Sequence, residues 1–175
     1  MQELKERIVK EGKVLPGNII MVDGFLNHRI DTELMAHIAE EFGKHFNMDE
    51  VTMILTAEAS GIALSAIVAQ HFHKPMIFAK KAKSDNIEGG LYQSDIFSYT
   101  YKKKVTLLVS KEWLSADDKV LIIDDFMANG EAMRGLCDIV TAAGATLVGI
   151  GCAVEKGFQG GGDRLRAAGV NLKSL

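Results

Sequence analysis

The run VLIIDDFMANGEA, at residues 120–132, constrains the fold of this chain more than any other segment. It opens with four apolar residues, mostly β-branched, which predicts a strand buried on both faces. Asp124 and Asp125 end the predicted strand, a turn of small residues follows, and an apolar-periodic segment from Glu131 predicts a helix. A buried strand that passes through a short turn into a helix is typical of a parallel α/β sheet.

The same junction predicts a ligand site. In open α/β sheets the ligand lies beyond the carboxyl ends of the strands, and the turn amides and the positive end of the helix suit a phosphate. Asp124 and Asp125 cannot bind that phosphate, but carboxylates accept hydrogen bonds from ribose hydroxyls. An acidic pair after a parallel strand also occurs in flavodoxin-like receiver domains and in metal-dependent hydrolases, so the pair alone leaves those classes open.

The rest of the chain alternates between strand and helix patterns. Strands are predicted at 19–22, 51–55, 75–79, 146–154 and 170–172, and helices at 1–12, 31–46, 60–72, 131–143 and 163–168. Residues 96–101 and 105–109 alternate like the two strands of a β-ribbon, with Lys102, Lys103 and Lys104 between them. We therefore predict an α/β fold with a parallel sheet, helices on both faces and a β-ribbon arm.

Composition limits the classes of partner and the compartment. The 175 residues suffice for one domain with a core, and a net charge of −3 gives no reason to expect nucleic acid or an anionic membrane. The apolar runs are too short to cross a bilayer, and the N-terminus lacks the apolar stretch of a signal peptide. Cys137 and Cys152 lie in apolar runs, which indicates buried free thiols and a reducing cytoplasm.

Residues 120–132 resemble the phosphoribosyl diphosphate (PRPP) motif of type I phosphoribosyltransferases, a hydrophobic strand followed by two acids and a small-residue loop. The segment DDFMANG, at 124–130, is most similar to the xanthine-specific branch of that family. The resemblance implies that Asp124 and Asp125 hold the ribose hydroxyls. It also implies that a loop wraps the 5′-phosphate with Ala128, Asn129, Gly130, Glu131 and Ala132. Because such a loop binds through backbone N–H groups, the Glu131 side chain is expected to point outward.

The resemblance also implies how pyrophosphate and base are held. The loop after the strand at 51–55 would cradle pyrophosphate through Ala59 and Ser60, often with a non-proline cis peptide, and Lys81 would help to neutralise it. Ile20, Asn27 and Lys156 match positions that contact the purine in xanthine-specific enzymes. Xanthine carries carbonyls at C2 and C6, to which an Asn amide and a Lys ammonium can donate hydrogen bonds.

The function implied is transfer of the phosphoribosyl group from PRPP to N9 of xanthine, giving XMP and pyrophosphate in purine salvage. Mg²⁺ would arrive with PRPP rather than on protein ligands, no general base is assigned, and a homodimer is expected. One domain would span residues 1–175, with a hood from about 1–30 and 155–175 that a short further segment usually completes in the family. A hypoxanthine or guanine transferase and a non-catalytic PRPP-binding regulator are the alternatives.

Overall fold

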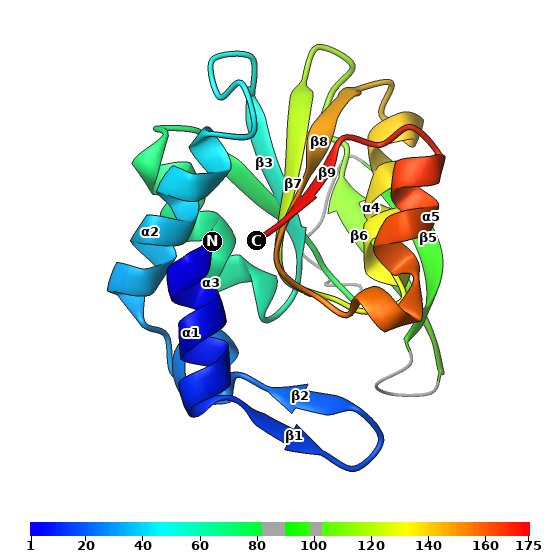
Figure 1. The fold of residues 1–175 in the computed structure, drawn as a ribbon. Coiled ribbons are helices and arrows are strands. Elements are labelled where there is room, and N and C mark those ends of the chain that lie inside the picture. The colour runs from blue at the N-terminus through cyan, green and yellow to red at the C-terminus, as the bar shows by residue number, and fades with distance from the viewer. Residues whose placement is uncertain (82–89, 99–102) are drawn as a thin grey trace.

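The computed structural model describes residues 1–81, 90–98 and 103–175, and its centre is a five-stranded sheet in the order β4-β3-β7-β8-β9 (Figure 1). Every neighbouring pair in this sheet is parallel. The strands are β3 (Met53–Ala57), β4 (Met76–Ala79), β7 (Lys119–Met127), β8 (Thr146–Glu155) and β9 (Leu172–Ser174). Because the strands are parallel, their carboxyl ends meet at one edge of the sheet.

Strand β7 is buried on both faces, as its apolar run predicts. Leu121 and Ile123 belong to one hydrophobic cluster, whereas Val120 and Ile122 belong to a second cluster on the opposite face. Successive side chains of a strand point to opposite faces, so each face of β7 needs its own apolar cover. The strand continues through both aspartates to Met127, which differs from the prediction, because Met127 still pairs with Glu155 of β8.

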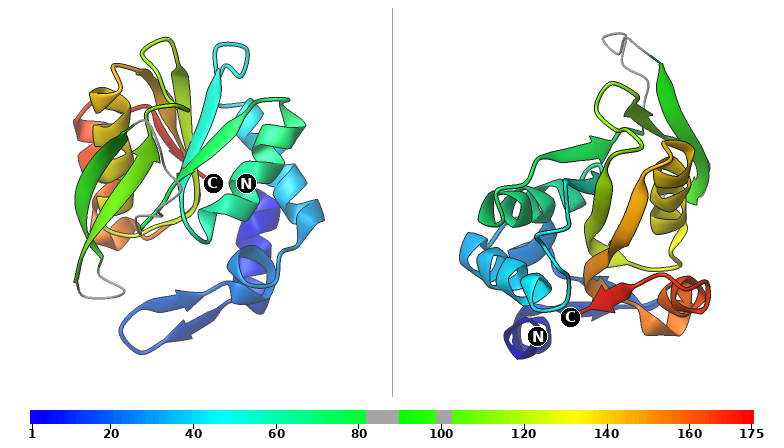
Figure 2. Two further views of the ribbon diagram at one scale, coloured as in Figure 1. Left: turned by 180° about the vertical axis from the view of Figure 1, so that it is seen from behind. Right: turned by 90° about the horizontal axis from the view of Figure 1, so that it is seen from above.

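Helices cover both faces of the sheet, as predicted (Figure 2). Helices α2 (Thr32–Gly43) and α3 (Gly61–His71) pack on one face, and α4 (Glu131–Ala142) packs on the other. Asp31 caps α2 as expected, since its carboxylate accepts a hydrogen bond of 3.1 Å from the backbone N–H of Leu34.

The β-ribbon consists of β5 (Leu91–Ser98) and β6 (Lys103–Ser110), an antiparallel pair that lies against α4. It starts earlier than predicted, and Lys103 and Lys104 belong to β6 instead of lying between the strands. Their cross-strand pairing with Ser98 and Phe97 accounts for the difference, because pairing cannot be inferred from one strand alone. Residues 82–89 and 99–102, which include Lys102, lie outside the described residues.

The N-terminal segment lies beside the end of the chain. Helix α1 (Gln2–Glu11) is followed by a projecting hairpin of β1 (Lys13–Leu15) and β2 (Ile19–Met21), and by the short π-helix η1 (Asp23–Asn27) (Figure 1). The amino group of Met1 donates a hydrogen bond of 3.1 Å to the carbonyl of Leu175. Strand β1 was not predicted, because its three exposed residues carry no pattern of burial.

The chain closes with the 3₁₀ turn η2 (Gly157–Gln159), helix α5 (Gly161–Ala167) and β9, which begins two residues later than predicted. Among the described residues, no helix is long and apolar enough to cross a membrane.

Candidate active site

The acidic pair lies at the carboxyl end of β7 and is almost fully buried. Asp124 is 7% exposed and Asp125 only 1%. The backbone N–H of Asp125 donates to Asp124 Oδ1 at 3.1 Å, and the Ser60 hydroxyl donates to Asp125 Oδ1 at 2.9 Å. Asp125 Oδ2 is buried without a hydrogen-bond partner in the described structure. Since buried polar atoms are normally paired, this oxygen keeps an unused capacity to accept a hydrogen bond.

Burial raises the pKa of the Asp124 carboxyl well above its usual range, and the adjacent charge of Asp125 raises it further. Two carboxylates with little access to water repel each other and lose hydration. The nearby Lys81 ammonium opposes this effect. Hydroxyl donors from a sugar would therefore relieve an arrangement that is electrostatically unfavourable in the free protein.

A glycine lets helix α3 approach this pair closely. A Cβ atom at Gly61 would lie 2.2 Å from Asp124 Oδ1 and 2.3 Å from Thr56 Oγ1, far inside contact distance. Thr56 Oγ1 is itself buried without a partner in the described structure. Any larger residue at position 61 would displace the carboxylate that the site presents.

The loop after β7 is shaped for a phosphate. Gly130 adopts a φ of 79°, a conformation that L-residues with side chains rarely take, and α4 begins directly afterwards at Glu131. Asn129 Oδ1 accepts a hydrogen bond of 3.3 Å from the Glu131 N–H. The N–H groups at this helix terminus otherwise lack intrahelical partners, which makes them a site for an anion.

Helix α5 supports this loop from behind. A Cβ at Gly161 would lie 2.5 Å from the backbone carbon of Asn129, so only glycine permits the observed contact. Arg164 donates a hydrogen bond of 2.7 Å to the Asn129 carbonyl. The triple glycine at 160–162 therefore includes a residue that packs against the phosphate loop.

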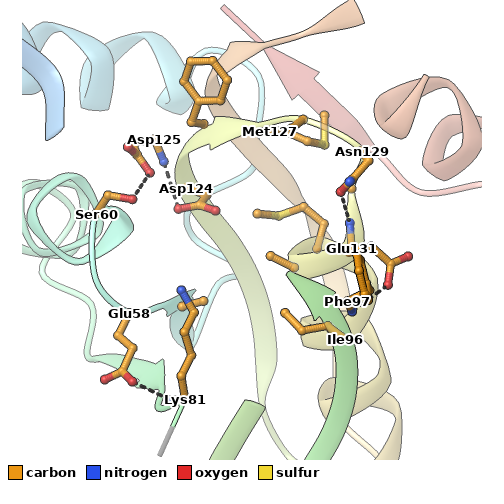
Figure 3. Close-up of a pocket in the computed structure, with 16 residues that line it drawn as sticks. Glu58, Ser60, Lys81, Ile96, Phe97, Asp124, Asp125, Met127, Asn129 and Glu131 are labelled. Atoms are coloured by element: carbon orange, nitrogen blue, oxygen red, sulfur yellow. Dashed lines mark hydrogen bonds between the residues drawn. The ribbon is translucent and has the colours of Figure 1, made fainter. Parts of the chain in front are cut away.

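The Glu131 side chain points away from the aspartates, as the backbone-binding argument predicts (Figure 3). Its carboxylate lies 3.2 Å from Arg134 Nη2 and accepts a hydrogen bond of 3.3 Å from the Phe97 N–H. The Arg134 hydrogen bond lowers the pKa of Glu131, so the group is ionised and paired at neutral pH.

The second loop, between β3 and α3, faces the acidic pair. The Glu58–Ala59 peptide is cis, as the family resemblance implies for a pyrophosphate loop. The carboxylate of Glu58 accepts a hydrogen bond from the backbone N–H of Lys81, and the Lys81 ammonium points toward the aspartates (Figure 3). Ser60 joins this loop to Asp125.

These elements line one pocket of about 270 Å³ (Figure 3). The predicted residues that line it are Asp124, Asp125, Ala128, Asn129, Gly130, Glu131, Ala132, Ser60 and Lys81. Ala59 is an exposed neighbour outside the lining. Anionic groups of a sugar phosphate would meet loop amides at one end of this pocket and Lys81 at the other.

The three predicted base contacts lie outside the pocket lining. Lys156 is next to it, because its backbone N–H donates to Met127 at 2.8 Å and its ammonium lies 5.2 Å from the Phe126 ring centroid. Asn27 ends η1 and is half-buried, and Ile20 lies in the projecting hairpin. The structure thus places Lys156 beside the pocket, and the contacts of Lys156, Asn27 and Ile20 with a base remain predictions.

Several residues that line the pocket were not among the site residues predicted from the sequence. The lining also includes Ala57, Glu58, Ile96, Phe97, Phe126, Met127 and Met133. Ile96 and Phe97 come from the ribbon, about thirty residues before the loop they face, and sequence spacing does not predict that contact. The glycines at 61 and 161 are a signal that could have been used, since glycine next to a ligand loop often marks close backbone approach.

A parallel sheet that ends in a buried acidic pair, with a phosphate loop opening a helix, defines a sugar-phosphate-binding α/β protein. The chain belongs to the family described as the phosphoribosyl transferase domain, whose profile matches residues 23–164. The family resemblance of the sequence and its predicted fold are therefore confirmed.

Curated relatives cover the whole chain. A xanthine phosphoribosyltransferase of Bifidobacterium animalis subsp. lactis is 51% identical, with 100% of this chain and 91% of that protein aligned. One from Lachnoclostridium phytofermentans is 52% identical over 100% of this chain and 90% of that protein. One from Ligilactobacillus salivarius is 48% identical, with 100% and 91% covered.

Solved structures share the fold at much lower identity. The adenine phosphoribosyltransferase of Giardia lamblia, complexed with 9-deazaadenine, has a TM-score of 0.82 and 21% identity, over 98% of this chain and 95% of that one. The enzyme of Thermoanaerobacter pseudethanolicus has a TM-score of 0.78 and 18% identity, over 99% and 97%. At these identities the likeness establishes the fold alone.

Proposed function

We propose that this protein transfers the 5-phosphoribosyl group of PRPP to N9 of xanthine, releasing pyrophosphate and forming XMP for purine salvage. The observation that carries this function is the single pocket that contains both the buried acidic pair and the phosphate loop. The xanthine phosphoribosyltransferases that are about half identical over the full chain support the choice of base.

The site residues have separate proposed roles. Asp124 and Asp125 accept the ribose hydroxyls, and Asp125 Oδ2 has the free acceptor capacity for this. The amides of residues 128–132 hold the 5′-phosphate, while Lys81 and the loop at Ala59 and Ser60 hold pyrophosphate. Together they orient C1 of the ribose toward the base and exclude water from the developing positive charge.

Magnesium is proposed to accompany PRPP. In the described part of the chain, no group of three or more His, Cys, Asp or Glu side chains is arranged to hold a metal ion. The negative charge of the buried carboxylate pair suits a cation that is carried into the pocket by PRPP. When bound, Mg²⁺ would neutralise part of the pyrophosphate charge as the C1–O bond breaks.

The base is proposed to lie near Lys156, under a hood from about 1–30 and 155–175. The lysine adjoins the pocket, and the hydrogen bond between Met1 and Leu175 joins the two parts of that hood. The Lys156 ammonium would donate to O6 or N7 of xanthine, and the Asn27 amide to O2. A homodimer and a cytoplasmic location remain predictions.

The decisive assay follows pyrophosphate release with PRPP, Mg²⁺ and xanthine, hypoxanthine or guanine in turn. Turnover of xanthine well above the other two is expected. No turnover with any base would favour a PRPP-binding regulator, and equal turnover of hypoxanthine would remove the claim of xanthine specificity.

Lys156→Met tests the base site separately. We expect kcat/KM for xanthine to fall at least about tenfold, as when one charged hydrogen bond is lost, with PRPP binding retained. Lys111→Met is a matched control, because the Lys111 ammonium also lies 5.2 Å from an aromatic centroid, that of Tyr92, outside the pocket lining. Equal effects of the two substitutions would contradict the role of Lys156.

A further inference from the structure

Three charged residues of α4 form one stripe that faces the ribbon strand β5. Glu131, Arg134 and Asp138 are spaced by three and four positions, which places them on one side of a helix. Each contacts one residue of β5: Glu131 meets Phe97, Arg134 meets Asp95, and Asp138 meets Ser94. The helix and the strand are thus joined along their length by polar contacts.

Two of these contacts are short, and they involve a backbone carbonyl and a side-chain hydroxyl of β5. Arg134 Nη2 donates to the Asp95 carbonyl at 2.7 Å, and the Ser94 hydroxyl donates to Asp138 Oδ2 at 2.8 Å. Arg134 Nη1 also donates to Asp138 Oδ2 at 2.7 Å. Arg134 therefore connects the strand with the last acid of the stripe.

The same helix approaches the ribbon as closely as atoms allow. A Cβ at Gly135 would lie 2.5 Å from Ile96 Cγ2 and 3.0 Å from Leu107 Cδ1. Gly135 therefore permits an apolar contact directly beside the charged stripe. The position of β5 on α4 is held by packing and by hydrogen bonds together.

The contacts between α4 and β5 extend as far as the phosphate loop. Glu131 is the first residue of α4 and a member of the loop, and its partner Phe97 lines the same pocket together with Ile96. A shift of β5 would therefore move a wall of the pocket and the start of α4 together.

The positive charge of Arg134 also affects the electrostatics of the phosphate loop. An acid beside a phosphate site repels the phosphate unless a cation balances it. Arg134 Nη2 lies 3.2 Å from Glu131 Oε2, so the guanidinium offsets part of the negative charge that Glu131 brings to the loop.

We propose that Glu131, Arg134 and Asp138 form a clasp that fixes β5 to α4 and positions the phosphate loop for PRPP. They act as positioning residues, since their side chains hold the ribbon instead of the substrate. This inference rests on the proposed function, because it assigns the clasp to the PRPP step of that reaction.

Arg134→Met is the central test, because methionine keeps the apolar stem and removes the hydrogen bonds of Arg134 to the Asp95 carbonyl, Glu131 and Asp138. KM for PRPP should rise about tenfold, the change expected for about 1.4 kcal/mol. KM for xanthine should stay within about twofold, since the clasp does not touch the base region. Amide hydrogen exchange in residues 91–98 should become faster.

Lys44→Met is the matched control. It removes an i,i+3 pair of 2.7 Å with Glu41 on α2, whose residues do not line the pocket. The control should leave both KM values and the exchange of residues 91–98 unchanged. Glu131→Gln keeps an oxygen for the Phe97 N–H and should change KM for PRPP less than Arg134→Met does, so it serves as the second variant if the first fails to fold.

The clasp would be refuted if the substituted proteins kept both the wild-type KM for PRPP and the wild-type exchange rates. Equal rises in KM for PRPP and for xanthine would also refute it. A drop in melting temperature with unchanged KM for PRPP would likewise leave only a structural role and refute the proposal. Failure of the proposed function looks different, because the wild-type protein would then turn over no purine. The exchange measurement does not depend on turnover and still tests whether the stripe holds β5.

Discussion

Asp125→Asn should stabilise the free protein while it removes PRPP binding. Asp125 is 1% exposed, lies beside Asp124, and has one oxygen without a partner in the described structure. Asparagine has the same shape, and its oxygen can still accept the Ser60 hydroxyl. The substitution removes one of two buried like charges, and the new amide N–H₂ can donate to Asp124.

The gain follows from the cost of a buried polar group without a partner, about 1–3 kcal/mol. A chain of this length shifts its melting temperature by roughly 2–4 °C per kcal/mol, so Asp125→Asn should melt about 2–12 °C higher. Asp117→Asn is the control, since it removes the same charge from an exposed position before β7. The control should melt within about 1 °C of the wild type, as surface substitutions usually do.

The effect should depend on pH with a definite sign. Because the folded-state pKa of Asp124 is raised, the folded protein binds more protons than the unfolded chain above an ordinary carboxyl pKa of about 4. Wild-type stability therefore falls as pH rises through the window between the unfolded and folded pKa values. The advantage of Asp125→Asn should grow across that window and shrink in acid.

The predicted loss of PRPP binding is tested by the change in melting temperature that the ligand causes. A ligand at a hundred times its dissociation constant stabilises a protein by about 2.7 kcal/mol, so PRPP with Mg²⁺ should raise the melting temperature of the wild type clearly. The variant should lose this shift. If Asp125→Asn melted at or below the wild-type temperature, or kept the full PRPP shift, the electrostatic reasoning would be refuted.

Three further predictions follow from close contacts and burial. Gly61→Ala should destabilise the fold by about 1–3 kcal/mol in urea titrations, because its Cβ would overlap the Asp124 carboxylate; an unchanged midpoint would contradict this. Gly161→Ala should raise KM for PRPP about tenfold and leave KM for xanthine unchanged in steady-state assays, since its Cβ would displace the backbone at Asn129. Burial and the adjacent Asp138 raise the pKa of Cys137 to about 11, so its alkylation at pH 8 should be much slower in the native protein than in denaturant, and equal rates would refute that environment.

Local sequence was sufficient for the central features of this protein. The buried apolar run of β7, the acidic pair near its carboxyl end and the start of α4 could be predicted because each depends on neighbouring residues. The apolar run needs cover on two faces, and a positive φ needs glycine. The family resemblance then added the cis peptide, which the structure contains, and the proposed role of Lys81, and spacing alone would have supplied neither.

Element ends were less predictable, because they depend on partners elsewhere in the chain. Strand β7 runs past its aspartates since β8 continues to pair with it, and β5 begins at Leu91 since β6 supplies a partner there. The residues that pair with these strand ends lie about twenty or more positions away in the sequence, so the local pattern does not indicate where the pairing stops.

The sequence by itself determined that a buried strand would present two acids and a phosphate loop at one edge of a parallel sheet. Only the tertiary structure decided what surrounds them. It placed the ribbon residues Ile96 and Phe97 in the pocket wall, Gly161 behind the loop, and the backbone N–H of Phe97 as a partner for the Glu131 carboxylate. Strands and loops depend on the local periodicity of apolar residues and on the backbone freedom of single residues, so a short stretch of sequence predicts them. The contacts named here join segments tens of residues apart, and they depend on packing that no local pattern encodes.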